Sequence, residues 1–275
     1  MRLLLVGAGH AHLEILRRLA EERPAGVELT LLSPEPRQVY SGMVPGYLAG
    51  TYALDEISVP VEPLAARAGG RLAEGRATAL DPERRIVRLK DSRELPYDLA
   101  SFAVGSNTAG IDRSGVAEHA VPIKPLGRVV ELREKIESLA REPEAERTAA
   151  VVGGGAAGTE VALALRAALG PGAKIHLLEA GSRVLSEYPE RFRERALAAL
   201  AGKGIEVLAG TPVARVGPHS ATLEDGREIP AALTIWLAGA VGWPLFRDSG
   251  LPLDDRGFLL LDDSLRSVAD PKIFA

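Results

Sequence analysis

The chain carries the same short pattern twice, and this repeat constrains the fold more than any other feature of the sequence. Residues 3–12 read LLLVGAGHAH, and residues 149–158 read AAVVGGGAAG. Each copy is an apolar run, then a glycine-rich turn, then the start of a helix. Such an apolar run is typical of a parallel strand that is buried on both faces. The repeat therefore predicts two strand–turn–helix units, each opening an α/β domain.

Both turns have the character of a diphosphate-binding site. Glycines at such a turn let the backbone approach a pyrophosphate, whose charge lies against the N–H groups of the helix N-terminus. The second copy has all three glycines of the dinucleotide motif, whereas the first has His12 in place of the third. The motif glycines are Gly7, Gly9, Gly153, Gly155 and Gly158. Two such motifs in one chain suggest two bound dinucleotides.

The end of the second strand distinguishes the two copies. In this motif an acidic residue there bonds the hydroxyls of the adenosine ribose. Glu179 lies as far beyond Gly158 as Ser33 lies beyond His12. A carboxylate at position 179 accepts hydrogen bonds from the ribose and repels a 2′-phosphate, so we expect NADH to be preferred over NADPH. Ser33 departs from the motif, although a serine can still bond a hydroxyl.

Composition excludes several classes of function. A net charge of −4 argues against a nucleic-acid partner, since no basic surplus is available to replace phosphate counterions. The chain has no cysteine, which excludes disulfides, thiolate metal sites and thiol redox chemistry. We expect no metal site either, because His10 and His12 are two residues apart and do not share a helix face. No apolar run is long enough to cross a bilayer, so we expect a cytoplasmic protein.

The remaining hydrophobic pattern alternates between helix and strand. Helices are expected over residues 13–22, 60–67, 129–139, 161–169 and 189–200. Strands are expected over residues 27–32, 72–80, 85–89, 97–106, 174–179, 205–208 and 233–240. Residues 40–50 (YSGMVPGYLAG) fit neither period and are expected to form a loop, either an ordinary surface loop or one that lies under a flat ring. This order predicts an α/β fold with two doubly wound, Rossmann-like parallel sheets.

The order of these landmarks resembles the pyridine nucleotide-disulfide oxidoreductase superfamily over essentially the whole chain. Within it, the sequences GHAH (9–12), YSGMVPG (40–46) and VPIKP (121–125) are similar to the branch that contains type II NADH dehydrogenases and the flavoprotein module fused to selenophosphate synthetase. The resemblance implies an FAD-binding domain of residues 1–113 and 238–275. An NAD(P)H-binding domain, residues 114–237, would be inserted into it.

The resemblance also implies roles for individual residues. Glu160 matches an acidic residue near the nicotinamide and flavin rings and is the catalytic candidate. The other interpretation of Glu160 is an exposed carboxylate stabilised by the helix dipole. Lys124 is either a solvated linker lysine or a group near the flavin. The expected cofactor-binding residues are Gly7, Gly9, His10, Ala11, Ser33, Pro34, Tyr40, Ser41, Gly42, Ala77, Val104, Gly105, Ser106, Lys124, Gly153, Gly155, Gly158, Glu179, Ala238, Gly239 and Ala240.

We therefore expect a flavin-dependent NAD(P)H oxidoreductase that passes hydride from NADH to FAD and electrons on to a small acceptor such as a quinone. The alternatives are an accessory flavoprotein of selenium metabolism and a nucleotide-binding module without turnover. The absence of cysteine argues against disulfide reduction and sulfide oxidation. Relatives continue beyond the equivalent of residues 270–275 with a Gly-Asp pair and a C-terminal domain, so we expect a truncated chain. Contact with the inner membrane would then be made only by the C-terminal region that this chain lacks. The sequence does not decide whether the intact parent protein is a homodimer.

Overall fold

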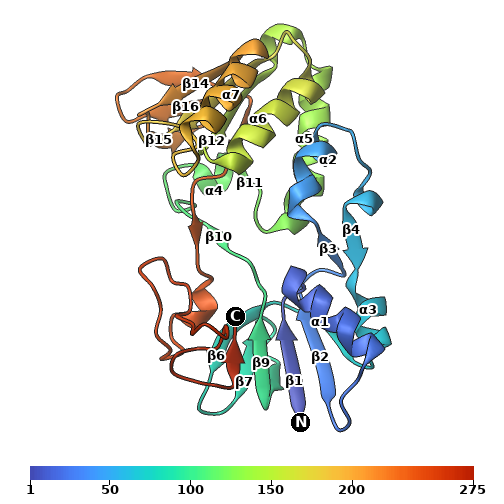
Figure 1. Cartoon of the computed structure of the whole chain (residues 1–275). Coiled ribbons are helices and arrows are strands. Elements are labelled where there is room, and N and C mark those ends of the chain that lie inside the picture. Colours follow the sequence, from blue (N-terminus) through green and yellow to red (C-terminus); the bar gives the residue numbers. More distant parts are fainter. The chain divides into compact units, whose positions relative to one another are not determined.

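The computed structural model describes all 275 residues, which form two compact units (Figure 1). The first unit comprises residues Met1–Gln38, Ser58–Asn107 and Ala240–Ala275. The second comprises Val39–Ile57 and Thr108–Gly239. The predicted boundaries assign residues 39–57 to the first unit. The structure groups them with the second, because their apolar side chains pack in its core.

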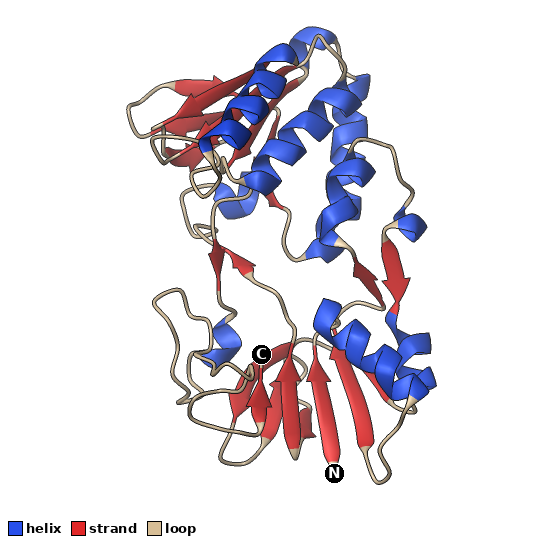
Figure 2. Ribbon diagram, in the orientation of Figure 1, coloured by secondary structure: helices blue, strands red, loops and turns tan.

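The first unit is built on a five-stranded parallel sheet (Figure 2). Its strands, in spatial order, are β20 (Ile273–Phe274), β9 (Leu99–Phe102), β1 (Arg2–Val6), β2 (Glu28–Ser33) and β5 (Arg71–Glu74). One face is covered by the helices α1 (His10–Glu21) and α3 (Val61–Arg67). The other is covered by an antiparallel sheet of β6 (Ala77–Asp81), β7 (Ile86–Leu89) and β8 (Glu94–Pro96). Leu5 packs toward the helices and Leu4 and Val6 toward the antiparallel sheet, which is why β1 is a continuous apolar run.

The second unit repeats this plan. Its parallel sheet has the order β11 (Ala120–Pro122), β18 (Leu233–Trp236), β12 (Thr148–Val152), β13 (Lys174–Glu179) and β14 (Ile205–Ala209). On one side pack α2 (Val44–Leu48), α5 (Val129–Arg141), α6 (Ala156–Leu169) and α7 (Glu190–Gly202). On the other pack α4 (Val116–His119) and the antiparallel strands β15 (Val213–Val216), β16 (Ser220–Leu223) and β17 (Glu228–Pro230).

Short elements complete the chain. Two-stranded ribbons are formed by β3 (Arg37–Val39) with β4 (Ser58–Pro60) and by β10 (Asn107–Thr108) with β19 (Ala240–Val241). They lie where the chain passes between the units. The 3-10 helices are η1 (Ser41–Met43), η2 (Leu54–Glu56), η3 (Leu126–Arg128), η4 (Glu144–Glu146) and η5 (Pro244–Phe246).

The predicted α/β class with two Rossmann-like parallel sheets is confirmed. In both units the face opposite the helices carries a three-stranded antiparallel sheet. The single strand expected over residues 72–80 is wrong. Gly75, with φ of +155°, separates β5 from β6, and the two strands belong to different sheets. No helix is both long and apolar enough to span a membrane.

The loop expected over residues 40–50 is also wrong. The segment forms η1 and the helix α2, and Val44, Tyr47 and Leu48 are buried against α5 and α6. Arg133 of α5 donates a hydrogen bond to the carbonyl of Tyr47 and lies over its ring. Tertiary packing therefore holds a helix that five residues containing proline and glycine would not form alone.

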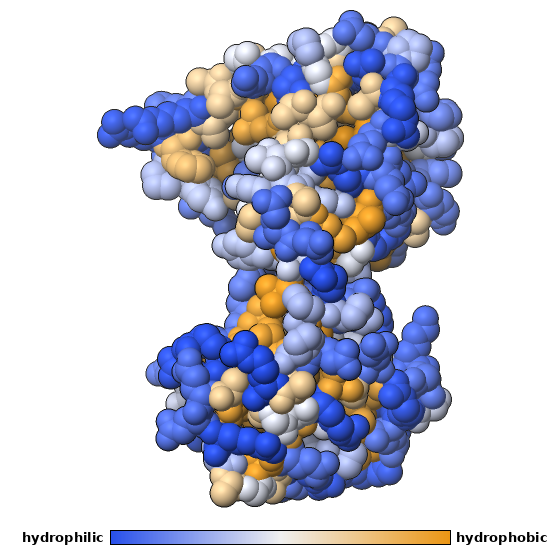
Figure 3. All heavy atoms as spheres, turned by 90° about the vertical axis from the view of Figure 1, so that its right-hand side faces the viewer, coloured by the Kyte–Doolittle hydropathy of each residue, from blue (hydrophilic) through white to orange (hydrophobic).

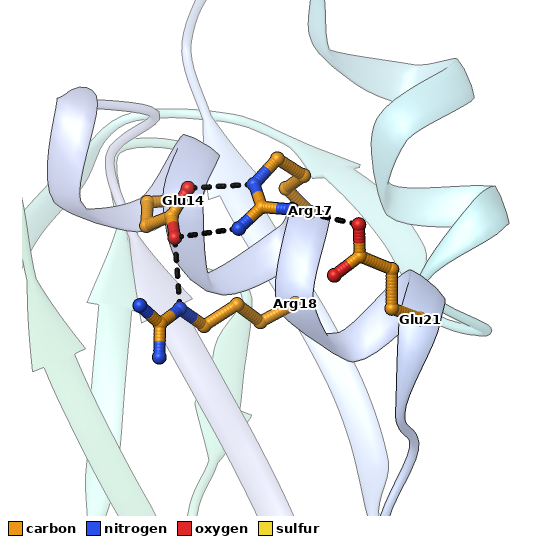
Figure 4. A network of polar contacts seen from close by, with 4 residues as sticks. All are labelled: Glu14, Arg17, Arg18 and Glu21. Carbon is orange, nitrogen blue, oxygen red and sulfur yellow. Dashed lines mark hydrogen bonds and ion pairs between the residues drawn. The ribbon is translucent and has the colours of Figure 1, made fainter.

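The outer surfaces are mainly hydrophilic on the face that Figure 3 shows, with hydrophobic atoms in separate patches. Helix α1 illustrates how the polar side is organised. Glu14 accepts hydrogen bonds from Arg17 and Arg18, and Arg17 also pairs with Glu21 (Figure 4). The same helix buries Leu16 against the sheet, as its period in the sequence predicts.

Candidate nucleotide-binding turns

The two motifs fold into turns with similar backbone geometry, the first turn (residues 7–12) after β1 and the second turn (residues 153–158) after β12. Gly7 has φ of +86° and Gly153 has φ of +117°, values that favour glycine. A Cβ on Gly7 would lie 2.5 Å from the carbonyl oxygen of Ala103, and one on Gly153 would lie 2.7 Å from that of Leu237. The fold itself therefore requires both first glycines.

The second glycines are the N-caps of α1 and α6, and neither helix has a side-chain cap. The N–H of Gly9 donates to the carbonyl of Ala103, at 3.1 Å. A Cβ on Gly9 would lie 2.7 Å from that oxygen. Gly155 is different, because its φ is −75° and no atom lies within 4 Å of a Cβ added there. Nothing within the chain requires glycine at position 155, whereas a close-lying diphosphate would.

The two turns differ most at the third glycine position of the motif, which is residue 12 in the first turn and residue 158 in the second. A Cβ on Gly158 would lie 1.8 Å from the carbonyl oxygen of Gly153, so α6 begins in direct contact with its turn. In the first turn His12 is fully buried, with Nδ1 2.5 Å from the carbonyl oxygen of Gly7 and Nε2 2.9 Å from the hydroxyl of Ser101. Burial lowers the pKa of His12, and the bond to the Gly7 carbonyl acts in the opposite direction. Neither this role of the ring nor Ser101 is predicted from the sequence.

Glu179 lies at the end of β13, beside the second turn. Its Oε2 accepts the N–H of Gly154 at 2.5 Å, and its Oε1 accepts the N–H of Gly181 at 2.6 Å. A Cβ on Gly154 would lie 2.6 Å from Val184 and 2.8 Å from the Cβ of Glu179, so this position needs glycine as well. Gly154 is not among the residues predicted from the sequence. Its signal is the run of three glycines at 153–155, one more than the spacing of the motif needs.

Ser33 takes the equivalent place at the end of β2. Its hydroxyl donates to the carbonyl of Glu35 at 2.8 Å, and only 4% of the residue is exposed. Ala8 stands where the second turn has Gly154. Pro34 follows on the surface.

In each sheet, small residues follow the strand that lies beside the motif strand, which is β9 beside β1 and β18 beside β12. Val104, Gly105 and Ser106 follow β9, and Ala238 and Gly239 follow β18. Gly105 and Gly239 have φ of +66° and +62°. An indole N–H fastens each region: Trp243 donates to the carbonyl of Val104 at 3.0 Å, and Trp236 to that of Ala109 at 2.8 Å.

The structure gathers the predicted residues in two groups, each at the carboxyl ends of the central strands, where ligands bind in open α/β sheets. The first unit brings together Gly7, Gly9, His10, Ala11, Ser33, Pro34, Val104, Gly105 and Ser106. The second brings together Gly153, Gly155, Gly158, Glu179, Ala238 and Gly239.

The other predicted residues lie apart from these groups in the chain. Ala77 begins β6 and Ala240 begins β19. Tyr40, Ser41 and Gly42 are exposed around η1, in the second unit, and Lys124 is partly buried after β11. Glu160 is exposed and is the fifth residue of α6, one position beyond the first turn of that helix.

A family model, Pyridine nucleotide-disulphide oxidoreductase, matches residues 1–275. The chain belongs to this family. The superfamily predicted from the sequence is thereby confirmed. The family name refers to disulphide chemistry, although residues 1–275 include no cysteine.

Curated relatives within the family are similar to the chain along its whole length. Demethylphylloquinone reductase NdbB of Synechocystis is 28% identical over 284 residues, which cover 100% of this chain and 70% of the relative. A probable NADH dehydrogenase of Dictyostelium discoideum is 27% identical, with 100% and 66% covered. The solved structure of NDH2 from Plasmodium falciparum in complex with NADH has a TM-score of 0.84 at 18% identity, with 100% of this chain and 63% of that chain covered. The chain thus spans about two thirds of the length of these proteins.

Proposed function

We propose that this chain is the nucleotide-binding part of a flavin-dependent NADH oxidoreductase, with FAD at the first turn and NADH at the second. One observation carries the proposal: two diphosphate-type turns in the same register, each at the carboxyl ends of a parallel sheet. The residues fit such ligands. Gly155 leaves open space above the start of α6, where only an approaching ligand calls for glycine.

The second turn has the features that favour NADH. A carboxylate has about four lone-pair positions. Two of those on Glu179 are taken by the N–H groups of Gly154 and Gly181, which leaves acceptors for the two hydroxyls of an adenosine ribose. The same negative charge opposes the 2′-phosphate of NADPH. Glu160, exposed on α6, is our candidate for the acidic group near the nicotinamide.

The first turn would hold the diphosphate of FAD, with Ala77 near the adenine and Val104, Gly105 and Ser106 along the cofactor. Bound FAD would supply the ring that accepts hydride, chemistry that amino-acid side chains do not provide. The chain's own residues bind and orient. For Tyr40, Ser41, Gly42 and Lys124 we propose a place near the flavin ring, on the resemblance to the family alone.

We propose a quinone as electron acceptor. The support is that relatives at 24–28% identity are named demethylphylloquinone reductase and, in Haemophilus influenzae, type II NADH:quinone oxidoreductase. A cytoplasmic location, peripheral contact with the inner membrane and a homodimer are further parts of this proposal.

The test is an anaerobic titration of the purified chain reconstituted with FAD. We expect a yellow protein whose flavin absorbance is bleached by NADH and restored by a short-chain quinone. A protein that binds both nucleotides but is not bleached would contradict the proposed activity and favour a binding module without turnover.

A variant tests the nucleotide preference. Glu179→Ala should raise the affinity for NADPH relative to NADH by at least about tenfold, because it removes two hydrogen bonds to a charged group and one repulsion. Glu228→Ala, on the antiparallel strand β17, is the matched control and should leave the ratio unchanged. An unchanged ratio in Glu179→Ala would show that the ribose lies elsewhere.

A further inference from the structure

The imidazole of His12 stands where the dinucleotide motif calls for a bare glycine. In the second turn the carbonyl oxygen of Gly153 rests against Gly158, with no room for a side chain. In the first turn the equivalent carbonyl, that of Gly7, is held by the ring of His12. Each turn thus fixes the same peptide group, one by close packing and the other by a buried hydrogen bond.

The partners of the ring determine its tautomer. The Gly7 carbonyl can only accept, so Nδ1 of His12 carries the proton and donates it across 2.5 Å. In the neutral ring Nε2 is then an acceptor, and the hydroxyl of Ser101 donates to it across 2.9 Å. Ser101 belongs to β9, the neighbour of β1 in the sheet. The ring is therefore fastened at both nitrogens and links the first turn to the adjacent strand.

Fixing the Gly7 carbonyl also fixes the N–H of the next residue, Ala8. In a trans peptide the C=O and N–H groups point in opposite directions, so the N–H of Ala8 is directed away from the imidazole. Its counterpart in the second turn, the N–H of Gly154, donates to the carboxylate of Glu179. The N–H of Ala8 has no acceptor within the chain, because Ser33 has replaced the acid and bonds Glu35 instead.

A buried backbone N–H without an acceptor is rare, and a ligand atom is one way to satisfy it. Ala8 is only 4% exposed, and it lies in the turn where we place the cofactor diphosphate. We propose that His12, anchored by Ser101, is a positioning residue that holds the Gly7–Ala8 peptide so that the Ala8 N–H donates to an oxygen of the FAD diphosphate–ribose. This inference rests on the proposed function, since it takes FAD as the ligand of the first unit.

Substitutions at position 12 distinguish the effect of the hydrogen bond that His12 donates to Gly7 from the effect of the space that the ring fills. His12→Leu keeps a large buried side chain but loses the donor to Gly7, and we expect about tenfold weaker FAD binding. His12→Asn places an amide N–H close to where Nδ1 lies, and should recover part of the affinity. His176→Leu, a histidine of β13 in the second unit, is the matched control and should bind FAD as the wild type does. Should His12→Leu not fold, Ser101→Ala loosens the same ring and should weaken FAD binding about threefold.

Two measurements make the test decisive: the FAD dissociation constant from flavin fluorescence, and NMR of protein labelled with ¹⁵N in histidine and alanine. We expect a slowly exchanging Nδ1 proton on His12 and an Ala8 amide resonance that moves when FAD is added. Variants that lower the melting temperature yet bind FAD like the wild type would show a purely structural role and overturn the inference. An Ala8 resonance unmoved by bound FAD would overturn it too. A wild-type chain that binds no FAD would instead contradict the proposed function itself.

Discussion

Single glycines separate what the fold requires from what a ligand requires. Gly158 has no room for a methyl group because the carbonyl oxygen of Gly153 would lie 1.8 Å from its Cβ. Gly155, three residues earlier, has open space around the same added atom and an ordinary φ. Two glycines of one motif are therefore held by different constraints, and mutation can separate them.

We expect Gly158→Ala to lower the free energy of unfolding by about 1–3 kcal/mol, the usual cost of forcing extra atoms into a packed site. Gly155→Ala should change it by less than about 1 kcal/mol, since the methyl group meets nothing. The same Gly155→Ala variant should weaken NADH binding at least about tenfold, because its methyl group would occupy the space of the diphosphate. Urea unfolding and an NADH titration measure the two effects. If Gly155→Ala bound NADH with wild-type affinity, the diphosphate of NADH would not lie at the second turn.

Among single residues, those that keep the spacing of a known motif are predictable from the sequence. Glu179 could be placed because its distance from Gly158 along the chain equals a motif length. The bond between His12 and Ser101 could not be predicted, because 89 residues separate them and only the pairing of β1 with β9 brings them together. The need for glycine at position 154 could not be predicted for a related reason. It arises from the side chain of Glu179, which lies on another strand.

Longer helices and strands were predicted from the sequence pattern more reliably than shorter ones. The strand at residues 174–179 and the helix that begins at residue 129 were predicted correctly, because each has several turns or alternations of apolar residues. The helix α2 was missed because it has five residues, two of them Pro45 and Gly46, and local propensity argues against it. What holds α2 is burial against α5 and α6, which no local window of sequence contains.

Helix α1 allows a prediction about pH. Hydrogen bonds from Arg17 and Arg18 lower the pKa of Glu14 from 4.5 to about 2 (Figure 4). A carboxyl with a lowered pKa in the fold adds stability above its unfolded pKa and loses it as the pH falls through the folded value. The extra stability of the wild type over Glu14→Gln should therefore be constant above pH 4.5 and disappear as the pH approaches 2.

The effect will be small, because all of these side chains are exposed and salt screens their charges. Melting temperatures across this pH range, at low salt, measure it. Glu62→Gln on α3 is the control, since Glu62 forms no ion pair in the structure. Parallel pH curves for the wild type and Glu14→Gln would contradict the assignment of Arg17 and Arg18 as the partners that lower this pKa.

Across the whole molecule, the two units share a plan that the sequence reveals only at its turns. Both have a parallel sheet in which the motif strand is third, a layer of helices on one face and three antiparallel strands on the other. The ends of the two motifs differ, with His12 and Ser33 in one unit and Gly158 and Glu179 in the other. Equivalent positions with different side chains are what two different dinucleotides would demand of one scaffold.

This division predicts that each ligand protects its own unit from hydrogen exchange. A ligand that binds only the folded state of a unit stabilises that unit by about 2.7 kcal/mol at a hundred times its dissociation constant, which slows exchange through unfolding of that unit about a hundredfold. FAD should slow exchange in β1, β2 and α1, and NADH in β12, β13 and α6. Gly155→Ala should lose the NADH effect and keep the FAD effect, because its methyl group lies in the second turn alone. Mass spectrometry of peptides from the two units reads both effects in one experiment. NADH protection centred on β1 and α1 would reverse the assignment of the ligands to the turns, and protection of neither unit would show that the glycine turns do not bind these nucleotides.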